Sequence, residues 1–209
     1  MNQQNDKNSA ASDNVVEVES RVSATARVSR NGHKSGVLWF TGLPGSGKST
    51  LAVELERQLF DAGYNVFVLD GDNMRRGLNA DLGFLPEDRT ENIRRVGEVA
   101  ALMAGAGLII IAAFISPYKS DRDRARAAAG ESFREIAVAA DLQTCEMRDP
   151  KGHYKRARAG EIPDFTGVSA PYEQPDNPDL IVDTQANDID ACVALLLDYV
   201  RAEFAVDDA

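Results

Sequence analysis

Short apolar runs alternate with segments of helical periodicity along most of the chain. A short apolar run suits a buried strand, and apolar residues spaced three and four apart suit one face of a helix. This pattern predicts strands over residues 37–41, 66–69, 108–114, 133–139 and 180–182. It predicts helices over residues 48–62, 87–106 and 120–129, and a last helix that Asn187 or Asp188 caps. We also expect Ser120 to cap the helix in which it lies.

The alternation of strands and helices predicts an α/β fold, a doubly wound parallel sheet with helices on both faces. Ligands in such folds bind beyond the carboxyl ends of the strands. Four segments are expected to meet there: residues 42–50, residues 70–72, residues 114–117 and the residues after Ala140.

Composition narrows the class of protein. The 209 residues suit one domain, which we place at residues 36–209, with a polar, partly disordered arm over residues 1–35 instead of a signal peptide or membrane segment. The net charge of −10 argues against nucleic acid as a partner. Cys145 and Cys192 lack metal-ligand spacing, which suits incidental thiols in a reduced cytoplasmic enzyme.

A glycine-rich loop joins the first predicted strand to the first predicted helix. It consists of Gly42, Leu43, Pro44, Gly45, Ser46, Gly47, Lys48, Ser49 and Thr50, which match the pattern G-x-x-x-x-G-K-S. In this context the backbone N–H groups and the helix amino terminus suit the phosphates of a nucleoside triphosphate. Lys48 would reach the terminal phosphates, and the Ser49 hydroxyl would bind Mg²⁺. We therefore expect a P-loop NTPase-type fold.

Two carboxylates, Asp70 and Asp72, follow the second predicted strand, which we expect to be buried. Phosphoryl transfer requires groups that hold Mg²⁺ and accept a proton, and a carboxylate can do both. The apolar strand over residues 108–114 ends without a carboxylate, so we assign the acid function to Asp70 and Asp72. This pattern favours a small-molecule kinase over a motor ATPase, and the absence of Asn-Lys-x-Asp argues against a GTPase.

Cations gather in two segments. The first holds Arg75, Arg76, Arg89, Arg94 and Arg95, and the second holds Arg148, Lys151, Lys155, Arg156 and Arg158. We expect both segments to face a small anionic ligand, since the arginine fork matches two oxygens of phosphate or sulfate. Glycine and proline in the second segment predict a mobile lid over about residues 148–170. Phe84 lies among the first group and suits either a stacked base or the core.

Short motifs run through about residues 31–184. They are Leu-Trp-Phe-Thr-Gly-Leu at 38–43, Leu-Asp-Gly-Asp-Asn at 69–73, Gly-Leu-Asn at 77–79, Leu-Gly-Phe at 82–84, Glu-Asp-Arg at 87–89, Glu-Asn-Ile-Arg-Arg-Val-Gly-Glu at 91–98, Phe-Ile-Ser-Pro-Tyr at 114–118, Arg-Asp-Pro-Lys-Gly at 148–152, Ala-Arg-Ala-Gly-Glu-Ile at 157–162, Phe-Thr-Gly at 165–167 and Ala-Pro-Tyr-Glu at 170–173. Each motif is weak alone, but the combination is specific. Together they resemble the adenylylsulfate kinase (APS kinase) family of P-loop kinases.

The resemblance implies ATP-dependent phosphorylation of the 3′-hydroxyl of adenosine 5′-phosphosulfate (APS), which gives 3′-phosphoadenosine 5′-phosphosulfate (PAPS) and ADP in sulfate assimilation. The implied catalytic residues are Asp72, Lys48, Asp70, Ser116 and Lys151, with Asp72 as the base or hydroxyl-positioning group. The implied APS-binding residues are Asp72, Arg75, Phe84, Arg89, Asn92, Ile115, Ser116, Lys151 and Phe165. Phe84 and Phe165 would stack on the APS adenine, and Arg148 would pack against the ATP adenine.

Mg²⁺ is the implied cofactor, held by Ser49 and through water by Asp72. In some family members a serine at the position of Ser116 is proposed to carry phosphate, although direct in-line transfer needs no covalent step. Pro44 departs from the small residue expected in the loop, and we expect a modest effect on nucleotide affinity.

The resemblance also implies a homodimer and functional coupling to an ATP sulfurylase. Two other functions stay open. One is a P-loop kinase for another small-molecule or nucleotide hydroxyl. The other is a nucleotide-binding regulatory subunit that has lost catalysis, although Lys48, Ser49 and Asp72 are all present.

Overall fold

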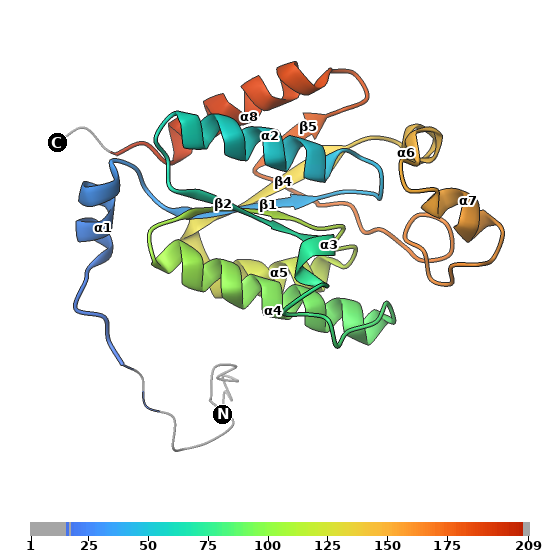
Figure 1. Cartoon of the computed structure of the whole chain (residues 1–209), viewed down its shortest axis with the longest axis horizontal. Coiled ribbons are helices and arrows are strands. Elements are labelled where there is room, and N and C mark those ends of the chain that lie inside the picture. The colour runs from blue at the N-terminus through green and yellow to red at the C-terminus, as the bar shows by residue number, and fades with distance from the viewer. Residues whose placement is uncertain (1–15, 17, 207–209) are drawn as a thin grey trace, which may run out of the picture.

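The computed structural model describes residue 16 and residues 18–206. Within them five strands form one parallel sheet in the order β2-β3-β1-β4-β5 (Figure 1). The strands are β1 (Gly36–Thr41), β2 (Val66–Asp70), β3 (Ile109–Ala113), β4 (Phe133–Ala139) and β5 (Leu180–Asp183). Because all the strands are parallel, their carboxyl ends lie along one edge of the sheet.

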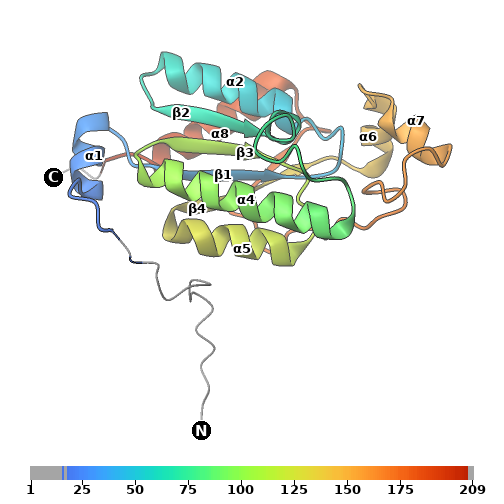
Figure 2. The same ribbon diagram turned by 60° about the horizontal axis from the view of Figure 1, so that its bottom comes forward.

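Helices cover both faces of the sheet. They are α1 (Ala24–Asn31), α2 (Lys48–Asp61), α3 (Gly71–Met74), α4 (Pro86–Gly105), α5 (Lys119–Ala129), α6 (Leu142–Arg148), α7 (His153–Arg158) and α8 (Ile189–Glu203), with a 3-10 turn at Gly130–Ser132. Helices α2 and α8 cover one face, and α4 and α5 cover the other (Figures 1 and 2). Helices α6 and α7 lie at the opposite end of the molecule from α1. The predicted doubly wound architecture is confirmed.

The central strand β1 explains why both faces need cover. Successive residues of a strand point to opposite faces. Leu38 and Phe40 therefore pack with α2 and α8, whereas Val37 and Trp39 pack with α4 and α5. All six residues of β1 are buried, so the loop that follows it starts from the middle of the sheet.

Most predicted element bounds agree with the structure to within about two residues, the usual uncertainty of helix and strand ends. The expected cap at Ser120 is wrong, because α5 already begins at Lys119 and Tyr118 precedes it without a side-chain cap. Asp188 is the residue that caps α8, through its carboxylate and the Ala191 N–H at 2.9 Å.

The arm expected over residues 1–35 is described only in part, since residues 1–15 and Glu17 lie outside the described residues. The part nearest the domain is helical. Ser23 caps α1, and Asn31 Nδ2 donates to the Gly107 carbonyl at 2.8 Å. The apolar pattern could not predict α1, because none of its residues is buried.

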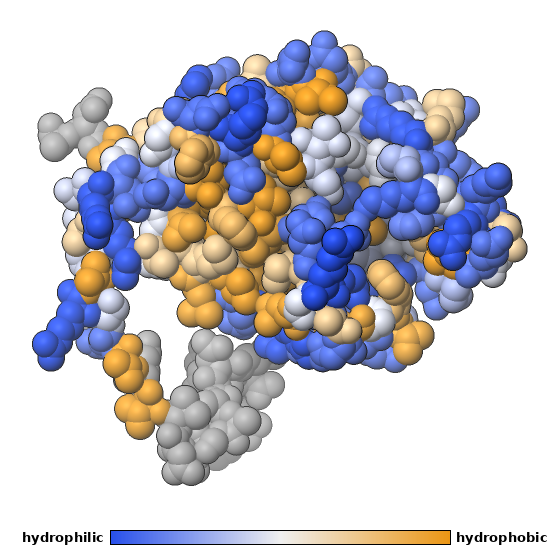
Figure 3. Space-filling view, in the orientation of Figure 1, coloured by the Kyte–Doolittle hydropathy of each residue, from blue (hydrophilic) through white to orange (hydrophobic). Residues whose placement is uncertain are grey.

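Strand β2 is an edge strand, not the buried strand expected before the two aspartates. It pairs with β3 alone, and Phe67 is 48% exposed. Figure 3 shows hydrophobic residues gathered on the face of the molecule where β2 lies. An apolar run of this length does not reveal whether a strand has one neighbour or two.

The structure also shows the state of the two cysteines and the character of the helices. Cys145 and Cys192 are both buried and free. Among the residues that the structure describes, no helix combines the length and apolar character needed to cross a bilayer.

We predict that Asp188→Ala lowers the free energy of unfolding by about 1 kcal/mol, because the N-terminal N–H groups of α8 lose their side-chain acceptor. Urea unfolding followed by circular dichroism measures the change. Asp198→Ala is the matched control, since it removes an equal charge from the exposed surface of the same helix. An equal loss in both variants would attribute the effect to charge and not to the cap.

Candidate active site at the carboxyl ends of the strands

The loop between β1 and α2 depends on glycine at two positions in particular. A Cβ atom on Gly42 would lie 2.5 Å from the Val138 carbonyl oxygen, so a side chain there cannot fit without movement of the backbone. Gly47 precedes α2 with a φ of 100°, in the left-handed region that favours glycine. Helix α2 then begins at Lys48, so the loop ends at a helix amino terminus, which favours anions.

Lys48 turns back into the loop that precedes it. Its Nζ donates to the carbonyl oxygens of Gly42 at 2.9 Å and Leu43 at 2.8 Å. Burial lowers the pKa of Lys48 to about 8, although the nearby Asp70 carboxylate opposes the change. A desolvated ammonium group gains strongly from a nearby anion, which suits a phosphate ligand at this loop.

Asp70 links the end of β2 to the phosphate loop. Its Oδ2 accepts a hydrogen bond from Ser49 Oγ at 2.7 Å, and its Oδ1 accepts from the Asp72 N–H at 3.0 Å. Asp72 itself forms an ion pair with Lys151 of the lid. The two carboxylates therefore differ in their surroundings: Asp70 lies beside the Ser49 hydroxyl, and Asp72 lies beside Lys151.

Two arginines arrange the aromatic residues. The Arg75 guanidinium lies over the Phe84 ring, 4.4 Å from its centroid. Arg89 donates from Nε to the Phe84 carbonyl at 2.8 Å and from Nη1 to Thr166 Oγ1 at 2.7 Å. Because Thr166 directly follows Phe165, Arg89 connects the two segments that carry Phe84 and Phe165. Phe84 is largely exposed, whereas Phe165 is buried.

Asn92 lies in a buried pair with Asn79. Asn79 Nδ2 donates to Asn92 Oδ1 at 3.0 Å, and both residues are buried. Because Asn92 accepts through its oxygen, its amide nitrogen is the group that can donate to a ligand. Asn79 Oδ1 has no hydrogen-bond partner within the described part of the chain. Sequence reasoning quoted the motif that contains Asn79 but gave this residue no role.

The loop after β3 holds Ser116 in an unusual conformation. Ser116 has a φ of 40°, is buried, and accepts a hydrogen bond at Oγ from Trp39 Nε1 at 3.1 Å. The neighbouring Ile115 carbonyl accepts from Thr41 Oγ1 at 2.8 Å. Both residues predicted at this loop therefore lie at the end of β1, next to the phosphate loop.

Arg122 connects the loop after β3 to two other segments of the chain. Its Nη1 donates to the Ser116 carbonyl at 2.8 Å, and its Nη2 donates to the Glu173 carbonyl at 2.9 Å. Its Nε donates to Glu135 Oε1 at 2.7 Å, in an ion pair between the buried Arg122 and the partly buried Glu135. These contacts fix the loop after β3 against the segment that returns from the lid. Sequence reasoning missed Arg122, because it lies in a helix that looks uniformly charged.

The predicted lid segment packs on the phosphate loop through a small apolar cluster. The cluster consists of Leu43, Cys145, Tyr154, Ala157 and Phe165. Tyr154 Oη donates to the Pro44 carbonyl at 2.9 Å, and burial raises the pKa of Tyr154, which keeps its hydroxyl protonated. The Phe165 ring meets the Tyr154 ring edge-on, with centroids 5.0 Å apart. The predicted lid therefore contains the short helix α7 and contacts the phosphate loop.

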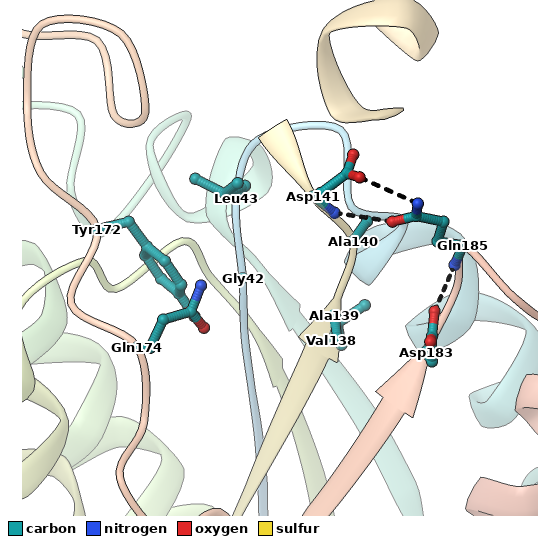
Figure 4. Close-up of a pocket in the computed structure, with 10 residues that line it drawn as sticks. All are labelled: Gly42, Leu43, Val138, Ala139, Ala140, Asp141, Tyr172, Gln174, Asp183 and Gln185. Carbon is teal, nitrogen blue, oxygen red and sulfur yellow. Dashed lines mark hydrogen bonds between the residues drawn. The ribbon is translucent and has the colours of Figure 1, made fainter. Parts of the chain in front are cut away.

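A hollow of about 260 Å³ lies on the other side of the phosphate loop, at the ends of β1, β4 and β5 (Figure 4). It is lined by Gly42, Leu43, Val138, Ala139, Ala140, Asp141, Tyr172, Gln174, Asp183 and Gln185. Gln185 and Asp141 hold each other through two hydrogen bonds, of 3.2 and 3.0 Å. Because β2 and β5 are opposite edges of the sheet, this hollow and Asp70 flank the loop from opposite sides.

Thr184 ties the end of β5 to the phosphate loop. Its Oγ1 donates to the Ser46 carbonyl at 2.8 Å and accepts from Arg148 Nη1 at 3.1 Å. Arg148 therefore lies on the side of the loop away from Asp72. Nothing in the pattern of the sequence pointed to Thr184 or Gln185, which follow an ordinary short strand.

Only part of each cationic segment faces this site. Arg75, Arg89, Arg148 and Lys151 do, as their contacts above show. Four other arginines pair with surface carboxylates: Arg94 with Glu91, Arg95 with Asp81 and Glu91, Arg156 with Glu161, and Arg158 with Glu146. The expectation that both segments point as a whole at an anion is wrong for these four, because carboxylates close by on the surface neutralise them.

Comparison with known proteins identifies the family. The family model for adenylylsulphate kinase matches residues 34–183. An adenylyl-sulfate kinase of Staphylococcus epidermidis is 52% identical over 191 residues, which cover 91% of this chain and 96% of the relative.

Solved structures of adenylylsulfate kinases also resemble this chain. The APS kinase of Mycobacterium tuberculosis in complex with AMPPNP and APS has a TM-score of 0.76 and 48% identity, over 79% of this chain and 96% of that one. A hexameric APS kinase from Thiobacillus denitrificans has a TM-score of 0.64 and 34% identity, over 83% of this chain and 30% of that one. With the phosphate loop, the paired aspartates and the lid in these positions, the chain belongs to the adenylylsulfate kinase family of P-loop kinases.

Proposed function

We propose that the chain is an ATP-dependent kinase that phosphorylates the 3′-hydroxyl of APS, giving PAPS and ADP in sulfate assimilation. The contact between Ser49 and Asp70 carries the proposal, because it places the two aspartates directly beside the phosphate loop. Membership of the family supports the same reaction, as does the relative that binds AMPPNP and APS.

ATP would bind with its phosphates on the loop over residues 42–50. The N–H groups at the start of α2 and the Lys48 ammonium would neutralise the β- and γ-phosphates. The Lys48 ammonium already lies within the loop and needs only to exchange carbonyl acceptors for phosphate oxygens. Arg148 and the hollow beside β5 lie on the side where the adenosine of ATP would extend.

APS would bind on the side of β2 and β3. Phe84 is exposed there and would stack on the adenine together with Phe165, while Arg75, Arg89 and Asn92 supply N–H donors to the phosphosulfate and nucleoside. The anchoring of Arg89 to both aromatic segments supports a site that is largely formed before APS binds.

The residues present fit Mg²⁺. Ser49 Oγ and Asp70 Oδ2 are hard oxygen donors in mutual contact, and no cluster of three or more acidic, histidine or cysteine side chains suited to a metal occurs in the described residues. Such a limited donor set suits an ion that keeps several waters and binds phosphate oxygens. Asp72 would contribute through water. When bound, the ion would neutralise charge on the phosphates.

Asp72 would position the acceptor hydroxyl and accept its proton, while Lys151 would turn from Asp72 to the transferring phosphate. Both side chains are exposed, so this exchange of partners costs little. Ser116 has a different role in the proposal. Its buried hydroxyl already accepts from Trp39, which supports direct transfer to APS without a phosphoserine.

We further propose that the enzyme works as a homodimer in the cytoplasm and is coupled in function to an ATP sulfurylase. The hexameric relative supports self-association within the family.

The test of the function is ADP release from MgATP with and without APS, with PAPS identified in the same mixture. We expect APS-dependent ADP matched by PAPS, and loss of both by orders of magnitude in Lys48→Ala. Turnover with a different hydroxyl acceptor would favour another P-loop kinase. ATP binding without turnover would favour a regulatory protein.

We predict that Asp72→Asn lowers kcat by about 10²–10⁴-fold while ATP binding stays measurable, because the variant loses a proton acceptor but keeps the loop. Steady-state kinetics and calorimetric titration with ATP measure the two effects. Asp70→Asn is the comparison: it should raise the Mg²⁺ concentration that turnover requires, because an amide is a weaker ligand than a carboxylate. A normal kcat in Asp72→Asn would move the acceptor role to Asp70.

We predict that Phe84→Ala raises the KM for APS by roughly 5- to 150-fold, since stacking on a base contributes about 1–3 kcal/mol. The KM for ATP should change little. Leu85→Ala is the matched control, because Leu85 is an exposed apolar neighbour without an aromatic ring. Equal losses for APS and ATP in Phe84→Ala would contradict the assignment.

A further inference from the structure

The amide group of Asn79 is buried at a cost that its own surroundings do not repay. Asn79 is fully buried in the turn that leads from α3 to α4 (Figure 1). Its Oδ1 has no hydrogen-bond partner among the described residues. An unpaired buried oxygen costs free energy, which an apolar side chain of similar size would avoid. The reason for an amide at this position therefore lies in its other end, the Nδ2 group.

The backbone of the turn holds Asn79 in place against α4. The Asn79 N–H donates to the Met74 carbonyl at 3.0 Å, and the Asn79 carbonyl accepts from the Leu82 N–H at 3.2 Å. The carbonyl of Leu78, the residue before it, accepts from Arg95 Nη1 of α4 at 3.2 Å. The turn is thus attached to both helices, and it presents the Asn79 amide to α4 from a fixed backbone.

The amide of Asn92 on α4 is divided between the interior and the surface. Its Oδ1 accepts from Asn79 Nδ2 at 3.0 Å. Its Nδ2 donates to no group in the part of the chain that the structure describes, yet Asn79 Oδ1 is the one fully buried side-chain atom there that lacks a partner. Asn92 Nδ2 therefore reaches the surface, although Asn92 as a whole is only 4% exposed.

Two arginines lie near this exposed nitrogen. Arg89 is one turn before Asn92 on the same face of α4. Arg89 donates to the Phe84 carbonyl, and Arg75 covers the Phe84 ring. Burial lowers the pKa of Arg75, and the positive charge of Arg89 lowers it further, against a smaller opposing effect of nearby carboxylates. Two guanidinium groups so close together favour an anionic ligand.

We propose that Asn79 is a positioning residue for APS, which holds the Asn92 amide with its nitrogen, and not its oxygen, toward the substrate. The inference rests on the proposed function, which places APS against Asn92. The Asn92 nitrogen adds a hydrogen-bond donor beside the two arginines without adding a third positive charge. A reversed amide would lose that donor and bring an oxygen against the anion. Asn79 thereby makes this part of the site selective for a ligand that accepts hydrogen bonds.

Asn79→Asp reverses the direction of the hydrogen bond between the two residues. The carboxylate has nearly the same shape as the amide but can only accept, so Asn92 would turn its nitrogen inward and its oxygen toward APS. We expect the KM for APS to rise roughly 10- to 150-fold, the range for a hydrogen bond to a charged group. The KM for ATP and kcat should stay within about threefold, since uniform binding alone is lost.

Asn79→Ala separates orientation from packing. It removes the donor without supplying an acceptor, so Asn92 can take either orientation. The KM for APS should rise only about 2- to 5-fold, the cost of restraining one side chain. A role in packing predicts the opposite order, with the larger loss for the smaller side chain. Circular dichroism verifies that each variant folds.

A double-mutant cycle shows whether Asn79 acts through Asn92. In the background of Asn92→Ala, neither Asn79→Asp nor Asn79→Ala should raise the KM for APS further. Fully additive losses would mean that Asn79 acts on another part of the site, and would overturn the proposal. The cycle with Asn79→Ala decides this question by itself if the carboxylate prevents folding.

Ala80→Asp is the matched control, because it adds the same charge at the exposed neighbouring position. It should change the KM for APS less than about threefold, since solvent and salt screen a surface charge. Equal effects of Ala80→Asp and Asn79→Asp would attribute the loss to charge and overturn the proposal. An unaltered KM in a folded Asn79→Asp would overturn this inference alone. Failure of the unaltered chain to use APS would overturn the proposed function and this inference with it.

Discussion

The burial of β1 at the centre of the sheet is the constraint on which the rest of the structure depends. Its residues need apolar cover on both faces, which places α2 and α8 above and α4 and α5 below. The phosphate loop therefore starts from the buried central strand of the sheet. Close contact between Gly42 and the Val138 carbonyl then holds the loop against β4. The polar groups of the site are arranged around that fixed point.

Different groups of side chains contact the phosphate loop on its two sides. On the side of β2, carboxylates and arginines gather where an acceptor would lie. On the side of β5, Thr184 and Arg148 connect the loop to the last strand. The phosphate loop lies between these two sides, so under the proposed function a phosphate on the loop would lie between the acceptor and the donor nucleotide. The fold alone sets this order, since β2 and β5 are opposite edges.

The sequence was sufficient for the architecture and for the phosphate loop, because both depend on local pattern: apolar periodicity and a glycine motif between a strand and a helix. It was insufficient to predict the role of a side chain whose contacts come from distant parts of the chain. Arg122 looks like a surface residue until its three partners, from β4 and two loops, are known. Arg94 and Arg158 looked like ligand-binding residues until their carboxylate partners were placed. The exposure of β2 depended on strand order, which local periodicity does not contain.

Pro44 stands where a small residue is expected in the phosphate loop. The hydrogen bond from Tyr154 to the Pro44 carbonyl shows a structural consequence of that difference. Proline has no N–H, so the carbonyl is the backbone group of Pro44 that can form a hydrogen bond. Tyr154 of α7 donates to that carbonyl. The ring also restricts backbone rotation at the point of attachment. The tip of the phosphate loop and α7 are thus joined at a position where the backbone can rotate little. The same residue that departs from the loop's usual pattern is therefore also the residue that attaches α7 to the loop.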